Sequence, residues 1–255
     1  MKDISTDTMT ICGFPVRQLE GFQKDIHSSQ ECGLGNEKGH QMKTILLNGS
    51  PRKNWNTHKL LMEAERGAKE MGDETEIIHL YDLNYTDCRS CFACKIKGTR
   101  TNGVCAVRDD LRPVLEKLHE ANAVIIGTPI YYDGMTGETA SLLHRMLFPT
   151  VLYDVDQAND KLNPIRKKCG LIVTSQVPEE VLRQGYNYPF EAAAEAISTY
   201  FGDCETLYAA DTYQFDDYSK YHANVFDLEH KIRQRDVQFP IYLQRAYELG
   251  KRVCS

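Results

Sequence analysis

Hydrophobic and polar positions alternate along the chain between short apolar runs and longer amphipathic stretches. The apolar runs predict strands at residues 43–48, 74–80, 123–128, 169–174 and 206–210. The amphipathic stretches between and after them carry apolar residues at three- and four-residue spacing, which predicts helices at residues 56–71, 109–120, 136–147, 190–201 and 240–253. Strands that alternate with helices in this way indicate a parallel sheet with helices on both faces.

The expected fold is therefore an α/β doubly wound sheet. Right-handed crossovers leave few possible topologies for its strands, and we expect the order 2-1-3-4-5. In a sheet of this order, ligands bind at the carboxyl ends of the first and third strands, where the strand order reverses. The loops after residues 48 and 128 are therefore the places to look for chemistry.

The first of these loops has the features of an anion site. It connects a buried strand to a helix N-terminus, where free backbone N–H groups and the helix dipole favour a phosphate. It lacks both the Gly-Lys-Ser/Thr of a P-loop and the G-x-G-x-x-G of a dinucleotide-binding turn. An ordinary strand-to-helix turn is the alternative. The residues expected to hold a phosphate are Ser50, Arg52, Asn54, Asn56 and Thr57.

The second loop offers flat aromatic surface and a glycine that allows close backbone approach, which is what a planar heteroaromatic ring requires. The alternative for its tyrosines is core packing. The residues expected to line the ring are Pro129, Ile130, Tyr131, Tyr132, Gly134 and Met135. In a third loop, after residue 174, the hydroxyl of Thr174 either contacts the polar edge of the same ring or caps a turn.

These loops carry a family resemblance. The stretch G-S-P-R-x-x-x-N-T at residues 49–57 and the Pro129–Gly137 segment resemble the NADPH-dependent FMN reductases, which are flavodoxin-like proteins. The resemblance covers about residues 42–254. It implies bound FMN, NAD(P)H as electron donor, and a quinone, a nitro or azo compound or another acceptor. It also implies a homodimer or higher homo-oligomer. Because the cofactor carries the chemistry, no side chain is assigned a catalytic role.

The most unusual local feature is a group of cysteines with the spacing Cys88-x2-Cys91-x2-Cys94-x10-Cys105. It resembles the motif of iron–sulfur flavoproteins, which implies a [4Fe–4S] cluster on these thiols and an electron carrier as the alternative function. The last spacing is longer than in those proteins. Zinc and free thiols remain the other interpretations, and reversible oxidation of free thiols would make the protein a redox sensor.

Composition and charge narrow the classes of protein to which the chain can belong. A net charge of −6 argues against nucleic-acid binding. No apolar run approaches the roughly 18 residues of a membrane span, and no secretory signal is visible, so we expect a cytoplasmic protein. Residues 1–41 are polar and without periodicity. We expect them to be a poorly structured or peripheral N-terminal extension, followed by a flavodoxin-like FMN-binding domain at residues 42–255.

Overall fold

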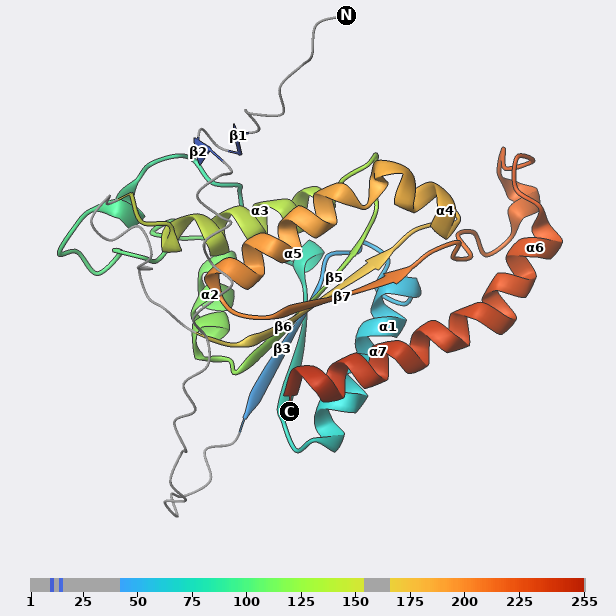
Figure 1. Ribbon diagram of the computed structural model, residues 1–255, viewed down its shortest axis with the longest axis horizontal. Helices are drawn as coiled ribbons and strands as arrows, with labels where there is room; N and C mark the ends of the chain where they lie inside the picture. Colours follow the sequence, from blue (N-terminus) through green and yellow to red (C-terminus); the bar gives the residue numbers. More distant parts are fainter. Residues whose placement is uncertain (1–9, 12–13, 16–41, 154–165, 255) are drawn as a thin grey trace, which may run out of the picture. The chain divides into compact units, whose positions relative to one another are not determined.

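The computed structural model of the protein describes residues 10–11, 14–15, 42–153 and 166–254. Contacts divide the chain into two units, Met1–His40 and Gln41–Ser255. In the first unit, β1 (Thr10–Ile11) and β2 (Phe14–Pro15) form an antiparallel pair. The rest of the predicted N-terminal extension lies outside the described residues. Every other element that the structure describes lies in the second unit (Figure 1).

The second unit is built on a parallel sheet with the strand order β4-β3-β5-β6-β7. Counted along this unit, that order is 2-1-3-4-5, so the predicted topology is confirmed. The register places the end of β3 beside the middle of β5, because Asn48 pairs with Gly127. The strands are β3 (Lys43–Asn48), β4 (Glu74–His79), β5 (Ala123–Pro129), β6 (Lys168–Thr174) and β7 (Cys204–Ala209).

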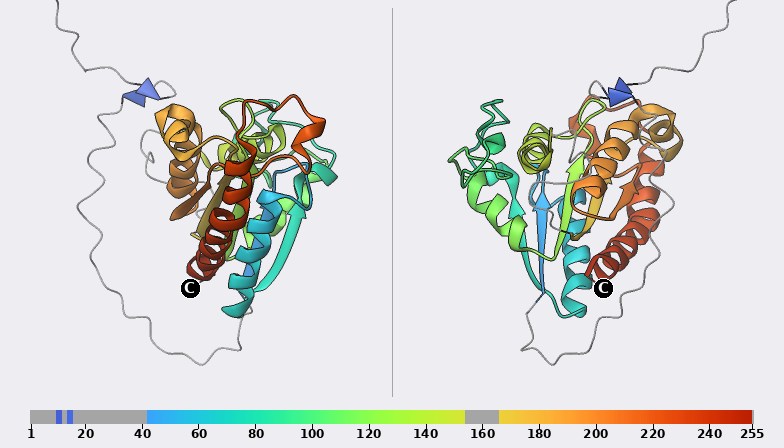
Figure 2. Two further views of the ribbon diagram at one scale, coloured as in Figure 1. Left: turned by 90° about the vertical axis from the view of Figure 1, so that its right-hand side faces the viewer. Right: turned by 60° about the vertical axis from the view of Figure 1, so that its left-hand side comes forward.

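Helices cover both faces of the sheet (Figures 1 and 2). On one face, α1 (Asn56–Glu70) and α7 (Phe239–Cys254) enclose a core that includes Leu46, Ile125 and Ile172. The helices of the other face enclose a second core; they are α2 (Leu111–Glu120), α3 (Gly137–Leu147) and α5 (Tyr188–Tyr200). Burial of the central strands on both faces explains their nearly continuous apolar sequences.

The helices α1 and α7 approach each other through glycine. A Cβ atom on Gly67 would lie 2.1 Å from the backbone oxygen of Tyr247, and one on Gly250 would lie 2.0 Å from the backbone oxygen of Ala64. The two helices are therefore in direct backbone contact at these positions. Because α1 carries the predicted phosphate loop at its N-terminus, this contact fixes the helix that presents the loop.

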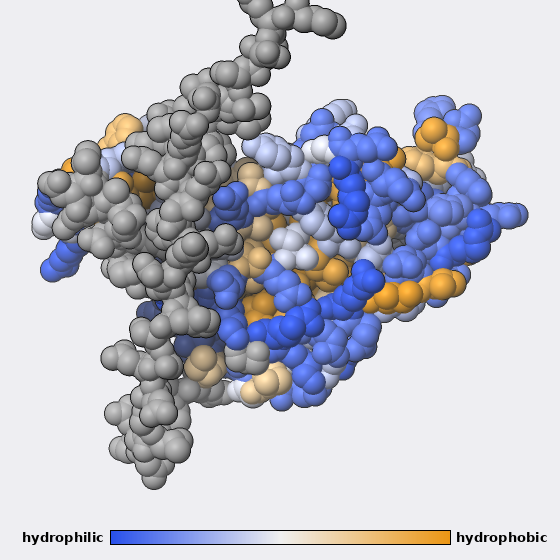
Figure 3. All heavy atoms as spheres, viewed as in Figure 1, coloured by the Kyte–Doolittle hydropathy of each residue, from blue (hydrophilic) through white to orange (hydrophobic). Residues whose placement is uncertain are grey.

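Several short elements were not predicted. They lie in the connections and are η2 (Leu80–Asp82), η3 (Ala93–Lys95), η4 (Phe148–Thr150), α4 (Glu179–Val181), η6 (Leu182–Tyr186), η7 (Tyr218–Lys220), α6 (Leu228–Arg233) and η8 (Gln234–Gln238). Within the described part of the chain, no helix has both the length and the apolar character to cross a membrane. The described atoms on the face seen in Figure 3 are mainly hydrophilic, with apolar residues in separate groups.

Candidate functional site

The first and second predicted loops meet at the carboxyl edge of the sheet. The N–H of Gly49 donates to the carbonyl of Gly127 at 2.8 Å. The hydroxyl of Thr136 donates to the carbonyl of Gly49, also at 2.8 Å. A Cβ atom on Gly49 would lie 1.9 Å from the hydroxyl oxygen of Thr139, so only glycine fits at this position. The two loops therefore form one connected structure.

The third loop joins the same edge. The buried hydroxyls of Thr57 and Thr174 are hydrogen-bonded at 2.8 Å. The N–H of Ile130 donates to the carbonyl of Thr174 at 2.9 Å. Thr174 thus links the start of α1 to the second loop, so the residues predicted from three distant parts of the sequence lie in one region.

The loop that leads into α1 has the geometry of an anion site. Ser50 is 5% exposed, its N–H donates to Asn48 Oδ1, and its hydroxyl accepts from the N–H of Arg52. Trp55, at the N-cap of α1, makes no side-chain capping bond. The N–H groups of the first helical turn thus lack the usual capping acceptor and can receive a phosphate. Asn54 is exposed on this loop.

A segment after β7 holds this loop in place. Arg52 donates to the carbonyl of Gln214 at 2.6 Å, while Trp55 Nε1 and Asn56 Nδ2 donate to the carbonyl of Tyr213 at 3.2 and 2.8 Å. The guanidinium of Arg52 lies 3.7 Å from the ring centre of Trp55, and burial lowers the pKa of Arg52. We name residues 211–221 the strap. No sequence pattern indicates the backbone contacts of the strap, since carbonyl groups are common to every residue.

The second loop ends in a strained turn that presents aromatic surface. Tyr131 and Gly134 exchange backbone hydrogen bonds at 2.9 and 3.1 Å, and the residues between them, Tyr132 and Asp133, have φ of 42° and 59°. Positive φ is unfavourable for a tyrosine and points to a functional constraint. Tyr132 is fully exposed and Tyr131 is 46% exposed, so neither is a core residue. The other predicted ring-binding residues are half-buried: Pro129, Ile130, Gly134 and Met135.

Two buried acceptors on the neighbouring loops lack hydrogen-bond partners. They are Gln176 Oε1, after β6, and Gln214 Oε1, in the strap. A buried acceptor without a partner costs free energy, so such an atom marks a place where a donor belongs. The anion site, the exposed tyrosines and the unpaired acceptors fit a ligand with a phosphate, a flat ring and a ring N–H donor. FMN has all of these.

The cysteine segment forms a second site on the face of the sheet covered by α3. All four cysteines of the motif line one pocket with about 320 Å³ of empty space, part of it open to solvent. Cys88 and Cys91 are exposed, Cys94 is buried, and Cys105 is half-buried. Burial raises the pKa of the Cys94 thiol.

The chain turns sharply on both sides of Cys91. Ser90 and Phe92 have φ of 51° and 55°, in the left-handed region. Successive turns of this kind direct backbone N–H groups into a concave surface of the type that surrounds phosphates and iron–sulfur clusters. They also bring the cysteines before and after them to one pocket. This local backbone is therefore suited to an anionic group.

The long spacing before Cys105 is closed by the backbone. The N–H of Gly103 donates to the carbonyl of Cys94 at 2.9 Å, so residues 95–102 form a closed loop and the chain returns to Cys94. Lys95 donates to the carbonyls of Phe148, Pro149 and Val151 and so attaches the loop to η4. The departure in spacing therefore does not separate the fourth cysteine from the others.

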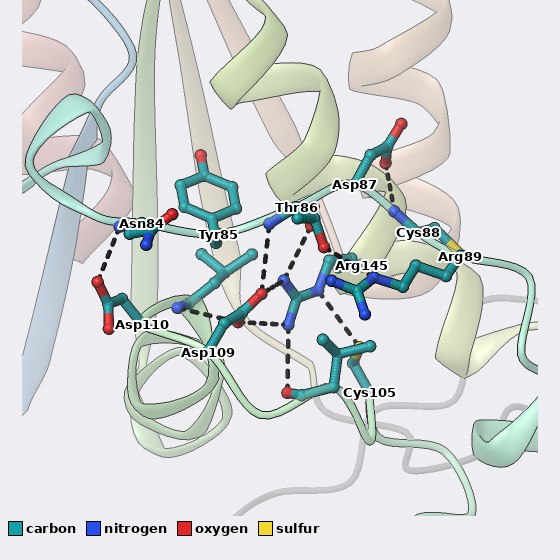
Figure 4. A network of polar contacts seen from close by, with 12 residues as sticks. Asn84, Tyr85, Thr86, Asp87, Cys88, Arg89, Cys105, Asp109, Asp110 and Arg145 are labelled. Carbon is teal, nitrogen blue, oxygen red and sulfur yellow. Dashed lines mark hydrogen bonds and ion pairs between the residues drawn. The ribbon is translucent and has the colours of Figure 1, made fainter.

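A buried arginine lies behind the pocket (Figure 4). Arg145, on α3, is 1% exposed and forms a bidentate ion pair with Asp109 at 2.6 and 2.9 Å. It also donates to the carbonyls of Thr86 and Val107, and its Nε donates to Cys105 Sγ at 3.3 Å. Burial opposes the charge, but the hydrogen bonds that Arg145 donates to Asp109 and Cys105 raise the pKa of Arg145.

No role for Arg145 was predicted from the sequence. The signal that could have identified it is its position among Leu142, Leu143 and Met146 on the buried stripe of a helix. A charged side chain on such a stripe requires a buried partner. The predicted helix began at residue 109, whereas α2 begins at Leu111, and the Asp109 carboxylate accepts the N–H of Thr86 in addition to its bonds with Arg145.

The cysteine segment supplies the right donors for a soft metal centre. Thiolates are the ligands of iron–sulfur clusters, and four of them line this pocket. Among the residues that the structure describes, no group of three or more metal-binding side chains is arranged around a common point. Because Cys88 and Cys91 are exposed, their side chains have room to turn toward a cluster.

Comparisons of sequence and of fold identify known proteins that this chain resembles. The family model described as NADPH-dependent FMN reductase matches residues 42–186. An iron–sulfur flavoprotein of Archaeoglobus fulgidus is 43% identical over 104 residues, which are 41% of this chain and 48% of that protein. An iron–sulfur flavoprotein of Methanocaldococcus jannaschii is 38% identical over 104 residues, or 41% of this chain and 51% of that protein. The matches thus span about half the length of these curated relatives.

Solved structures resemble this one in fold. An NAD(P)H:quinone oxidoreductase from Methanothermobacter marburgensis superposes with a TM-score of 0.59 at 13% identity, over 83% of this chain and 96% of that one. An FMN-dependent NADH-azoreductase from Bacillus anthracis, solved in complex with FMN, gives a TM-score of 0.57 at 14% identity, over 84% and 100%. At this identity the similarity establishes the sheet and its helices, not the substrate.

Proposed function

The chain belongs to the NADPH-dependent FMN reductase family, and we propose that it is an NAD(P)H-dependent FMN oxidoreductase. The observation that carries this proposal is the meeting of three loops at the carboxyl edge of β3 and β5. Bound FMN would supply the redox chemistry, taking electrons from a nicotinamide and passing them to a quinone, a nitro or azo compound or another acceptor. The protein would supply binding, orientation and shielding from water.

The loop before α1 holds the phosphate in this proposal. Backbone N–H groups of the first helical turn donate to the phosphate oxygens, and Ser50 and Thr57 shape the floor beneath them. The rim of the phosphate site is formed by Asn54, Asn56 and Arg52. Arg52 and Asn56 already bond the strap, so the strap closes the outer side of the site.

The second loop positions the ring. The half-buried segment from Pro129 to Met135 lies under it, and the exposed ring of Tyr131 or Tyr132 covers it. Thr174 lies at the base of the same edge, where its hydroxyl is bonded to Thr57. We assign no side chain an acid–base role, since hydride transfer from a nicotinamide requires none.

A second function rests on the cysteine pocket. With a [4Fe–4S] cluster on Cys88, Cys91, Cys94 and Cys105, the protein would act as an electron carrier between redox proteins. The gathering of these cysteines around one pocket supports this function, and the closed loop brings Cys105 back beside Cys94. The names of the two curated relatives agree with it. The two functions are compatible within one protein.

The proposed setting is the cytoplasm, and the proposed assembly is a homodimer that completes the shallow flavin site. Light scattering coupled to size-exclusion chromatography tests the assembly. A mass near 58 kDa, twice the 29.1 kDa of the chain, supports a dimer, whereas a mass near 29.1 kDa overturns it.

One preparation distinguishes the functions. The full chain is purified without oxygen, and its absorption spectrum, FMN, iron and sulfide are measured on the same sample. FMN with rapid NAD(P)H oxidation and no iron supports the reductase alone. FMN with about four irons per chain supports the cluster. A protein that retains no FMN and does not bind added FMN overturns the reductase function.

A further inference from the structure

The four cysteines of the pocket are not equivalent. Cys105 accepts a hydrogen bond from the buried guanidinium of Arg145 at 3.3 Å. Cys88 and Cys91 are exposed to solvent, and Cys94 is buried. A hydrogen bond from a permanently charged donor is stronger than one from a neutral donor. Cys105 is thus the thiol whose sulfur has a charged donor.

The hydrogen bonds of Arg145 leave no donor unused. A guanidinium has five N–H groups. The two Nη atoms serve Asp109 and the carbonyls of Thr86 and Val107, and Nε serves Cys105 (Figure 4). The ion pair with Asp109 is complete without Nε. The Nε–H group is therefore not needed for the ion pair and serves the sulfur of Cys105 alone.

The same arginine holds both ends of the cysteine segment. Thr86 lies before Cys88, and Val107 and Asp109 lie after Cys105. Arg145 contacts all three of these flanking residues from α3, which is packed in the core. The position of Cys105 is thus set by the folded protein and does not depend on a bound metal.

We propose that Arg145 is a positioning residue that places Cys105 as the fourth ligand of an iron–sulfur cluster and raises the reduction potential of that cluster. This inference rests on the cluster proposed above. A donor at a ligand sulfur stabilises the reduced cluster more than the oxidised cluster, because the reduced cluster carries one more negative charge. Exposed arginines near the pocket lack this direct contact with a sulfur in the part of the chain that the structure describes.

The test compares Arg145→Lys with Arg89→Lys. Lysine keeps the positive charge in each case but loses the planar guanidinium, and at position 145 it also loses the Nε–H that reaches the sulfur. Arg89 lines the same pocket but bonds Thr86 Oγ1 at 3.1 Å rather than a cysteine. For each full-length variant, iron and sulfide are assayed after anaerobic reconstitution. The midpoint potential of the cluster is then determined from its electron paramagnetic resonance signal.

The expected result for Arg145→Lys is a lower potential. At the midpoint potential of the unaltered protein, the ratio of reduced to oxidised cluster in Arg145→Lys is about tenfold lower. This ratio corresponds to a potential lower by about 59 mV for a one-electron couple. Arg89→Lys leaves the potential unchanged. Equal potentials in Arg145→Lys and the unaltered protein overturn the inference. An unaltered protein that takes up no iron overturns the cluster itself, and the inference with it.

A second measurement needs no variant and so can still overturn the inference if Arg145→Lys does not fold. The unaltered protein is reconstituted in D2O and in H2O, and the iron–sulfur stretching bands are compared by resonance Raman spectroscopy. An N–H···S bond from Arg145 to a ligand sulfur shifts a terminal iron–cysteine band on deuteration. Identical bands in the two solvents would contradict the role assigned to Arg145.

Discussion

The side-chain amide of Asn56 donates a hydrogen bond to the carbonyl of Tyr213 at 2.8 Å, across 157 residues of sequence. Asn56 begins α1, and Tyr213 lies in the strap that follows β7. The proposed phosphate loop is thus held by a segment outside the part that matches the family model, which ends at residue 186. The strap contributes to the proposed cofactor site through its backbone.

We expect Asn56→Ala to weaken FMN binding by about tenfold, the loss of one partly buried hydrogen bond that holds the site closed. Fluorescence titration of FMN measures the change. Lys69→Ala is the control and should bind FMN normally, because Lys69 lies at the opposite end of α1, where its exposed side chain pairs with the half-buried Glu65. Equal affinities in the two variants would show that the strap contact does not contribute.

The turn at Tyr132 gives a prediction with opposite effects on stability and function. Tyr132→Asn should raise the free energy of unfolding by about 1 kcal/mol, because asparagine tolerates the left-handed backbone better than tyrosine. The same change removes exposed aromatic surface and should weaken FMN binding or turnover. Urea unfolding and steady-state kinetics on one preparation test both effects. Asp133→Asn, at the next residue of the turn, should alter neither.

The contact between α1 and α7 gives a prediction that is independent of function. Gly67→Ala should lower the free energy of unfolding by about 1–3 kcal/mol, because the added methyl group forces two helix backbones apart. Gly137→Ala is the matched control, since no atom lies within 4 Å of the added methyl group. Denaturant unfolding of both variants provides the comparison. A Gly67→Ala protein as stable as the control would disprove the close contact.

The Asp109–Arg145 pair predicts a pH dependence of stability. Burial raises the pKa of the Asp109 carboxyl, but hydrogen bonds led by that from Arg145 outweigh burial and hold this pKa below its ordinary value. A carboxyl with a lowered pKa in the folded state stabilises the protein above the unfolded pKa, about 4, and this contribution is lost as pH falls further. Stability should therefore decline below about pH 4.

Asp109→Asn tests this origin directly. At pH 7 the variant should lose roughly 3 kcal/mol of unfolding free energy, because Arg145 remains buried without its counter-charge. The loss should shrink at pH 3, below the unfolded pKa of about 4, where the stabilising contribution of the Asp109 carboxylate is no longer fully present. Asp110→Asn should lose much less, since Asp110 accepts one backbone hydrogen bond from Asn84. Urea unfolding at the two pH values measures both, and a loss independent of pH would contradict the assignment.

Much of the fold was predictable because apolar runs and helical spacing are local signals. The prediction for Lys43–Asn48 agrees with β3 at both ends, and the other strands agree within two residues. The meeting of the first two loops followed from the strand order. Its details did not: nothing at Gly49 indicated that the hydroxyl of Thr139 would occupy the place of a side chain.

The contacts that complete each site were not predictable, because no local sequence pattern indicates them. The strap reaches Arg52 and Asn56 through carbonyl groups, which any sequence would supply. From the sequence, the partner of Arg145 could be narrowed to a buried carboxylate. Whether that carboxylate is Asp109 or Asp110 depends on how the chain turns between residues 105 and 111. Local patterns predict elements, whereas side-chain partners depend on how those elements pack.

Because the N–H of Gly103 donates to the carbonyl of Cys94, the number of residues between Cys94 and Cys105 does not determine how far apart these two residues lie. Residues 95–102 leave and re-enter the protein at adjacent points, so insertions and deletions there can accumulate during evolution without displacing the fourth thiol. A search that requires a fixed interval between the third and fourth cysteines would overlook chains that carry the same arrangement. The same loop offers a place to attach a reporter group or an affinity tag.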